Sequence, residues 1–267
     1  MKKGYSFLSK CGNFTIFFLV LVFCMPLISG YNKINARTSA SDVEENKKVV
    51  YLTFDDGPAN IVTNKILDTL KEKDIKATFF VIGDKISGRE EILKRIYGEG
   101  HTIGLHTYTH KFKKIYRSEE SFIEEMDLTR NEVKRVLNIE ATAIRFPAGS
   151  KPHLNDSLLE KLHAQGYKIY DWNASLSDGL NYNTPPDKLY REATKVVGKS
   201  TNVVLLLHCD QPNTNTCKAL PRIIDYYKEQ GYEFKPIKED TPEFYFRFKK
   251  NNVRKTVTTF IKNTMDK

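Results

Sequence analysis

Cysteine, tryptophan and glycine-rich loops are scarce in this sequence. It holds four cysteines and one tryptophan among 267 residues, and two of the cysteines fall within the first thirty residues. Cys209 and Cys217 remain, so the rest of the chain can form at most one disulfide, which their short spacing alone neither requires nor excludes. No glycine-rich loop follows any strand-like run, which excludes a phosphate-binding loop for nucleotides. No nucleic-acid partner is expected.

Acidic residues are absent from the first thirty positions. Three lysines precede an apolar run from Phe14 to Ile28, a pattern typical of an export signal. The run is longer than the usual signal-peptide core and shorter than a comfortable spanning helix, and Ile28-Ser29-Gly30 is a weak cleavage site. Residues 1–30 are therefore predicted to be a signal peptide or an N-terminal membrane anchor. In both cases the rest of the chain is expected outside the cytoplasm, secreted or on the cell-wall side of the membrane.

Bulky apolar side chains are rare in residues 31–48, which are predicted to form a polar linker. At the other end, residues 239–267 begin with aromatic residues and continue as a basic tail. A final strand or wrap-around segment fits this stretch, and so does a segment that binds a membrane surface or a polymer. The formal net charge of +9 suits anionic cell-wall polymers or phospholipid headgroups, although general lysine enrichment explains it equally well.

Between these ends, apolar runs alternate with amphipathic helical patterns. A buried strand is predicted from Val49 to Asp56, and Gly57-Pro58 ends it. Further strands are expected at 77–82, 102–105, 142–146, 167–172, 202–207 and 232–236, with helices at 60–73, 90–97, 118–137, 155–165, 186–197 and 216–230. This alternation is typical of βαβ units around a parallel sheet. About seven such units in one domain favour a closed or nearly closed (β/α) barrel over an open doubly wound sheet.

Two carboxylates and two imidazoles occur where predicted strands end. Asp55 and Asp56 end the first strand, where neighbouring buried charges need a cation or fixed donors, although capping of the next helix is an alternative role. His106 and His110 follow another strand, and their spacing brings both rings to one side of a turn. Two histidines and a carboxylate are typical ligands of catalytic zinc. Asp56, His106 and His110 are therefore predicted to bind a divalent metal.

A base and an acid for catalysis are predicted from the same strand ends. With Asp56 on the metal, Asp55 is free to act as a general base. His208 ends an apolar run and has the pKa range needed to protonate a leaving group, although a histidine at a strand end can also be purely structural.

Arg145 and the Asp171-Trp172 pair complete the set of predicted site residues. Arg145 offers a fork of donors that can hold Asp55 ionised, and the turn after it leaves backbone N–H groups for an oxyanion. Asp171 is predicted to orient His208 and raise its pKa, and Trp172 offers a flat surface for a sugar ring. Each of these residues alone could equally belong to a structural ion pair or an aromatic core.

Five ordered segments of the chain resemble the motifs of the polysaccharide deacetylases, also called the NodB-homology group or carbohydrate esterase family 4. The segments are Thr53 to Pro58, His106 to His110, Arg145 to Gly149, Asp171-Trp172 and Leu206 to His208. They place a deacetylase domain at residues 49–238. The resemblance implies a distorted (β/α) barrel of about seven parallel strands.

The resemblance also implies roles for individual residues. Zinc, or another divalent metal such as Co²⁺, Ni²⁺ or Mn²⁺, would be bound by Asp56, His106 and His110. Asp55 would be the base and His208 the acid, supported by Arg145 and Asp171 respectively, and substrate would meet Pro147, Ala148, Gly149, Trp172 and Leu206. Two departures stand out. Ala148 occupies a position where the family often has tyrosine, and Cys209 directly follows His208, which predicts an altered leaving-group side of the pocket.

The function predicted from these features is that of an exported, monomeric, metal-dependent amidase that removes N-acetyl groups from an amino-sugar polymer. The export signal and modest size favour cell-wall peptidoglycan over chitooligosaccharide, poly-N-acetylglucosamine or acetyl xylan. Two alternatives remain open at this stage. One is a carbohydrate-binding protein on an inactive deacetylase scaffold, and the other is a glycosidase that uses Asp55 with a second carboxylate.

Overall fold

The computed structural model describes residues 47–195 and 200–246. The predicted leader, nearly all of the predicted linker and the chain after residue 246 lie outside the described residues. Within the described ranges, no helix combines the length and the hydropathy needed to cross a bilayer.

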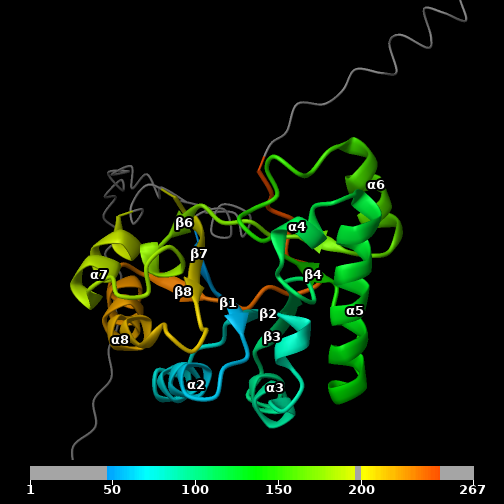
Figure 1. The fold of residues 1–267 in the computed structure, drawn as a ribbon. Helices are drawn as coiled ribbons and strands as arrows, with labels where there is room; N and C mark the ends of the chain where they lie inside the picture. The colour runs from blue at the N-terminus through cyan, green and yellow to red at the C-terminus, as the bar shows by residue number, and fades with distance from the viewer. Residues whose placement is uncertain (1–46, 196–199, 247–267) are drawn as a thin grey trace, which may run out of the picture. The chain divides into compact units, whose positions relative to one another are not determined.

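Parallel strands form one curled sheet at the centre of the domain (Figure 1). Seven strands follow the order β5-β4-β3-β2-β1-β7-β6, and an eighth, β8, pairs with β1. Their bounds are β1 (Lys48–Gly57), β2 (Thr78–Val81), β3 (Thr102–Leu105), β4 (Ala143–Ile144), β5 (Lys168–Ile169), β6 (Ala174–Ser175), β7 (Asn202–His208) and β8 (Tyr232–Phe234). The predicted distorted barrel of about seven parallel strands is confirmed, as a curled half-barrel.

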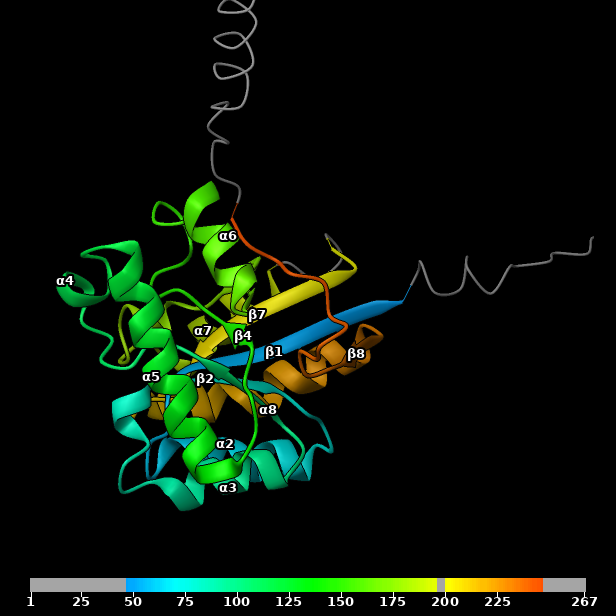
Figure 2. The same cartoon turned by 90° about the vertical axis from the view of Figure 1, so that its right-hand side faces the viewer.

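Helices connect the strands and cover the outside of the sheet (Figures 1 and 2). They are α2 (Val62–Glu72), α3 (Glu90–Gly98), α4 (Phe112–Ile115), α5 (Glu119–Leu137), α6 (Asp156–Ala164), α7 (Pro186–Thr194) and α8 (Thr214–Glu229), with 3-10 turns η1 (Gly83–Lys85) and η2 (Ser177–Gly179). Two of the predicted helix starts are explained by capping: Ser118 accepts from Ser121 N and Asn155 from Leu158 N.

Two predicted strands are shorter in the structure, for identifiable reasons. The strand expected at 142–146 is regular only over β4; Arg145 N still donates to Leu105 O at 3.0 Å, and Pro147, which has no N–H to donate, cannot extend the pairing further. The strand expected at 167–172 pairs with β4 only over β5, and its extension bonds the C-terminal segment instead, since Asp171 N donates to Phe244 O. The short elements β6, α4, η1 and η2 were not predicted.

Strand β1 lies in the middle of the sheet and determines where the site forms. Its apolar side chains Val50, Leu52 and Phe54 are fully buried in the core. It pairs with β2 on one side and β7 on the other, and the β7 register places Asp55 directly opposite His208. The carboxyl ends of the strands therefore gather the predicted site residues at one end of the half-barrel, as expected for this architecture.

Candidate functional site

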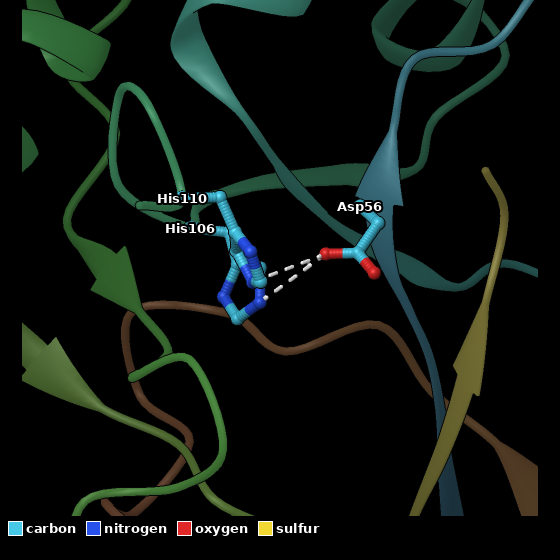
Figure 3. A group of neighbouring side chains, drawn as sticks. All are labelled: Asp56, His106 and His110. Carbon is cyan, nitrogen blue, oxygen red and sulfur yellow. Dashed lines mark ion pairs between the residues drawn. The ribbon is translucent and has the colours of Figure 1, made fainter. Parts of the chain in front are cut away.

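Asp56, His106 and His110 form a compact group at this end of the sheet (Figure 3). Asp56 Oδ1 lies 3.5 Å from Nε2 of His106 and 3.5 Å from Nε2 of His110, and one ligand atom from each residue lies within 4.8 Å of the others. Asp56 Oδ1 is buried and has no hydrogen-bond partner among the described residues. A buried, unpartnered carboxylate oxygen that faces two imidazole nitrogens fits a divalent metal ion.

The protonation of both histidines suits metal binding. His106 Nδ1 lies 2.9 Å from Arg145 O, which can only accept, so Nδ1 carries a proton and Nε2, which faces Asp56, is the atom available to a metal ion. Burial, aided by the nearby His106, lowers the pKa of His110 to about 4, so its ring is neutral at neutral pH. Metal ligation requires such neutral imidazoles.

The loop between the two histidines is held in an unusual backbone conformation. Thr107 and His110 have positive φ angles of 64° and 53°, and so does Asp56 on β1, at 72°. Residues other than glycine rarely adopt this region. Buried Glu125, on α5, fastens this loop by accepting hydrogen bonds from Tyr108 N at 3.0 Å and Thr109 N at 2.7 Å. Surrounding contacts of this kind are what maintain strained backbone at functional sites.

Glu125 was missed from the sequence. It also pairs with Lys114 Nζ at 2.8 Å, so it joins α4, α5 and the histidine loop. The available signal was the helical period, which places Glu125 near the buried face with Phe122 and Thr129 and places its neighbour Glu124 on the exposed face.

Asp55 lies beside the three candidate metal ligands Asp56, His106 and His110, which we call the metal group. It is almost fully buried. Its Oδ1 accepts a hydrogen bond of 2.9 Å from Arg145 Nη1, while Oδ2 lies 3.6 Å from His106 Nε2. Arg145 is fully buried and also donates to Thr53 Oγ1 at 2.7 Å and Tyr170 O at 2.7 Å. The predicted support of Asp55 by Arg145 is present, and one carboxylate oxygen remains directed toward the metal group.

His208 pairs with Asp178 and not with Asp171. His208 Nδ1 lies 2.9 Å from Asp178 Oδ1, and the His208 backbone N–H donates to Asp178 Oδ2 at 2.9 Å. Burial alone would lower the pKa of His208, but the hydrogen bond and charge of Asp178, with Asp55 and Asp56 behind them, raise it to about 9. Asp178 thus takes the place predicted for Asp171.

Asp178 was missed because it comes from η2, a turn, and not from a strand end. The available signal was the dipeptide Asp178-Gly179, which repeats the arrangement of Asp56-Gly57 after a short extended segment. Gly179 is needed for the arrangement, since a Cβ atom there would lie 2.2 Å from a ring carbon of His208. The imidazole therefore packs closely against the backbone of η2.

Asp171 occupies a different environment, and its predicted role was wrong. Its carboxylate accepts hydrogen bonds from Ser150 N at 3.0 Å and from Phe246 N at 2.7 Å. The extended segment after β5 bonds the C-terminal segment, so this side chain faces the turn after Arg145. It has no contact with His208.

A cleft of about 410 Å³ lies over these residues. The predicted substrate residues Ala148, Trp172 and Leu206 line it. Pro147 and Gly149 lie in the adjoining turn instead. Pro147 O accepts a hydrogen bond from Tyr116 Oη at 2.6 Å, and Gly149 N donates to Phe146 O at 2.8 Å. The rest of the lining consists of Asp55, Asp56, His106, His110, Phe112, Ser175, Leu176, Gly179, Leu180 and His208.

Cys209 lies below the cleft and does not line it. Its backbone N–H donates to Asp55 O at 2.9 Å and its thiol lies 3.3 Å from the same oxygen. A Cβ atom on Gly57 would approach the sulfur to 2.7 Å. Both Cys209 and Cys217 are free thiols. Cys209 packs against the strand that carries Asp55 and contributes no side chain to the lining of the cleft.

Comparison with known proteins agrees with this geometry. A family model described as "Polysaccharide deacetylase" matches residues 42–170. A peptidoglycan-N-acetylglucosamine deacetylase of Bacillus cereus is 36% identical over 200 residues, which cover 74% of this chain and 72% of that protein.

Two solved structures show the same fold. The polysaccharide deacetylase Bc1974 from Bacillus cereus superposes with a TM-score of 0.66 at 33% identity, over 77% of this chain and 97% of that one. BA3943 from Bacillus anthracis, described as a CE4 family pseudoenzyme, has a TM-score of 0.63 at 26% identity. The match covers 72% of this chain and 64% of that one. The five-motif resemblance is confirmed by these matches, and this chain belongs to the polysaccharide deacetylase family, the NodB-homology or CE4 group of hydrolases.

Proposed function

We propose that this protein is an exported, metal-dependent deacetylase that hydrolyses N-acetyl groups of peptidoglycan. One observation carries the proposal. The buried, unpartnered Asp56 Oδ1 faces Nε2 of His106 and of His110, while a carboxylate and a protonated histidine from neighbouring strands flank the same cleft. This is the donor set expected for metal-assisted hydrolysis of an amide.

Asp56, His106 and His110 would hold the metal. Zinc, or Co²⁺, Ni²⁺ or Mn²⁺, would supply a Lewis acid for the acetamide carbonyl and lower the pKa of water at the site.

Asp55 and His208 then divide the proton transfers. Asp55 takes a proton from the attacking water, and its hydrogen bond to Arg145 leaves Oδ2 available for this role. Water adds to the carbonyl carbon, the C–N bond breaks, and His208 gives its proton to the departing amine. Because the pKa of His208 is raised to about 9, the proton needed for this step is present at neutral pH. The products are acetate and an amino sugar.

Ala148 is placed to stabilise the charge that develops on the carbonyl oxygen. It lies on the cleft wall with a φ of 63°, and no acceptor for its N–H is found within the part of the chain that the structure describes. A free, fixed N–H in a turn is a typical oxyanion donor. The alanine side chain in place of a larger one does not alter this backbone group.

The exposed apolar residues at the edges of the cleft support a polymeric substrate. Phe112 and Leu180 line the cleft, yet they are 47% and 93% exposed, so apolar surface is available at both lips for the C–H faces of neighbouring sugar rings. Peptidoglycan is favoured because the B. cereus relative is a peptidoglycan-N-acetylglucosamine deacetylase and because the first thirty residues have the pattern of an export signal.

Acetate release tests the proposed function. Purified protein is incubated with peptidoglycan, and separately with acetylated chitooligosaccharide, before and after treatment with a chelator. We expect acetate and a loss of one acetyl mass per modified sugar, abolition by the chelator, and recovery on addition of Zn²⁺. A binding protein on an inactive scaffold would release no acetate, and a glycosidase would shorten the chains without a need for metal. The presence of ligands, base and acid together argues against both.

The location of the protein is tested separately. An immunoblot of whole cells, membranes and medium, with and without added protease, shows whether the domain is accessible from outside. Full-length protein in the membrane fraction supports an anchor, and shortened protein in the medium supports a cleaved signal peptide. Protein that is protected from protease in intact cells would contradict export.

A further inference from the structure

The C-terminal end of the described chain extends the sheet beside the site. We call residues 241–246 the strap; Figure 2 shows it as the orange-red trace that runs from β8 toward α6. Phe244 forms a parallel bridge with Tyr170, Phe244 N donates to Ile169 O at 3.1 Å, and His163 of α6 pairs with Glu243 at 2.9 Å. The strap therefore occupies the free side of β5, where another strand would otherwise pair.

Asp171 joins the strap to the turn that carries Ala148. Its fully buried carboxylate is surrounded by three donors: Ser150 N at 3.0 Å, Ser150 Oγ, and Phe246 N at 2.7 Å. Its backbone oxygen accepts from Arg145 Nη2 at 3.0 Å. One residue thus connects the guanidinium that holds the base, the turn and the strap. A buried carboxylate with three such donors is a specific anchor, because loss of the donors would leave its charge uncompensated.

The ring of Phe246 fills the space behind the cleft wall. It packs edge-to-face on Trp172, with ring centres 5.2 Å apart. Gly149, with a φ of 91°, leaves room for it, since a Cβ atom there would lie 2.7 Å from the Phe246 ring and 3.3 Å from Trp172. The two wall residues next to this contact, Ala148 and Trp172, both line the cleft. The position of the wall therefore depends on the ring behind it.

We propose that the strap is part of the catalytic unit, and that Asp171 and Phe246 are positioning residues that set the Ala148 N–H and the Trp172 ring relative to the substrate. A displacement of about 1 Å in such a group is enough to cost up to about a hundredfold in rate. The inference rests on the proposed function for its activity readout only, because the contact between Phe246 and Trp172 can be measured without a substrate.

The chain offers a direct spectroscopic readout. Trp172 is its only tryptophan, so selectively excited fluorescence reports the environment of the cleft wall alone. Removal of the Phe246 ring exposes one edge of the indole to water, which shifts its emission to longer wavelength and increases quenching by acrylamide. Phe244→Ala is the matched control, because Phe244 lies on the same strap and is 37% exposed, whereas the ring that packs on Trp172 is that of Phe246.

The experiment compares Phe246→Ala, Phe246→Tyr, Asp171→Asn and Phe244→Ala in the full-length protein, each loaded with zinc. We expect Phe246→Ala and Asp171→Asn to lower kcat by about tenfold or more with unchanged zinc content, and to shift Trp172 emission. Phe246→Tyr should retain most of the activity, since it keeps the ring, and Phe244→Ala should match the wild type in emission. Thermal unfolding shows which fraction of each variant is folded at the assay temperature.

The outcomes separate the possibilities. If folded Phe246→Ala keeps the kcat and the emission of Phe244→Ala, the strap is structural only and the inference is wrong. If Phe246→Ala does not fold, kcat is measured on Phe246→Leu instead. Acrylamide quenching of Trp172 in the wild-type protein then tests the shielding directly, and strong quenching would contradict the inference. If the wild type releases no acetate but the emission of Trp172 shifts as expected, the proposed function fails while the strap contact holds.

Discussion

The two sides of the cleft are built differently. On the side of the metal group, Asp55 and Asp56 end the central strand and Arg145 is fully buried beneath them, with donors satisfied by side chains and carbonyls of the sheet. On the other side, His208 is oriented by Asp178, which comes from a 3-10 turn followed by the exposed Leu180. The sheet thus fixes Asp55, the proposed base, and a loop orients His208, the proposed acid. Substitutions should therefore be most harmful on the first side and most informative on the second.

The largest effect is expected for Asp55→Asn. The amide can still accept a hydrogen bond from Arg145, but it cannot take a proton from water, so kcat should fall by about 10²–10⁴-fold. Zinc content, measured by elemental analysis, should remain that of the wild type because Asp56, His106 and His110 are intact. Activity within tenfold of the wild type would show that the base lies elsewhere. The sheet side of the cleft would then not supply the base.

Asp178→Asn tests the loop-held acid. The charge and hydrogen bond of Asp178 raise the pKa of His208 to about 9 against the effect of burial. Their loss lowers that pKa, so the alkaline limb of the pH profile of kcat should move to lower pH, with a fall in kcat of about 10–100-fold at pH 8.

Asp171→Asn is the matched control for the pH profile. Its carboxylate contacts Ser150 and Phe246 and not His208, so its alkaline limb should stay where the wild type has it, even if kcat falls. An alkaline limb that moves in Asp171→Asn and not in Asp178→Asn would restore the original assignment from the sequence.

Glu125→Gln should weaken metal binding while leaving the ligands in place. Glu125 holds the histidine loop through two backbone N–H groups and through Lys114. Outer contacts of this kind typically contribute about 10-fold in metal affinity, measured here by competition with a zinc-binding dye. Lys114→Met removes only the half-exposed ion pair and should cost much less. Equal affinities in wild type and Glu125→Gln would mean that the strained loop does not need this support.

The smallest effect is expected for Leu180→Ala. Because the side chain is 93% exposed, the free energy of unfolding should change by no more than about 0.5 kcal/mol. Its loss should raise KM for long acetylated oligosaccharides by about two- to fivefold through lost apolar contact, with little change for a disaccharide. An equal rise for both substrates would place Leu180 at the reacting sugar and not at the lip.

The difference between the two sides also explains what the sequence could predict. The ends of parallel strands meet at one edge, so Asp55, Asp56, His106 and Arg145 could be brought together from strand patterns and spacing alone. Asp178 could not be added from the strand pattern, because it comes from a 3-10 turn whose position depends on tertiary contacts; only the weak Asp178-Gly179 turn signal marks it. Asp171 was assigned wrongly for the same reason: its direction is decided by the strap, which pairs with β5 from more than seventy residues away.

The register between β1 and β7 has a consequence for how this enzyme family can diversify. Asp55 and His208 are directly opposed on adjacent strands, so their backbones are separated by the interstrand distance, about 4.8 Å in any sheet. Mutations in loops are not expected to alter that distance, and a slip of one residue in either strand would turn that strand's side chain away from the cleft. Under the proposed function, we therefore expect adaptation to a new sugar or acyl group at the lips and the wall of the cleft, where side chains can change without altering the spacing of Asp55 and His208.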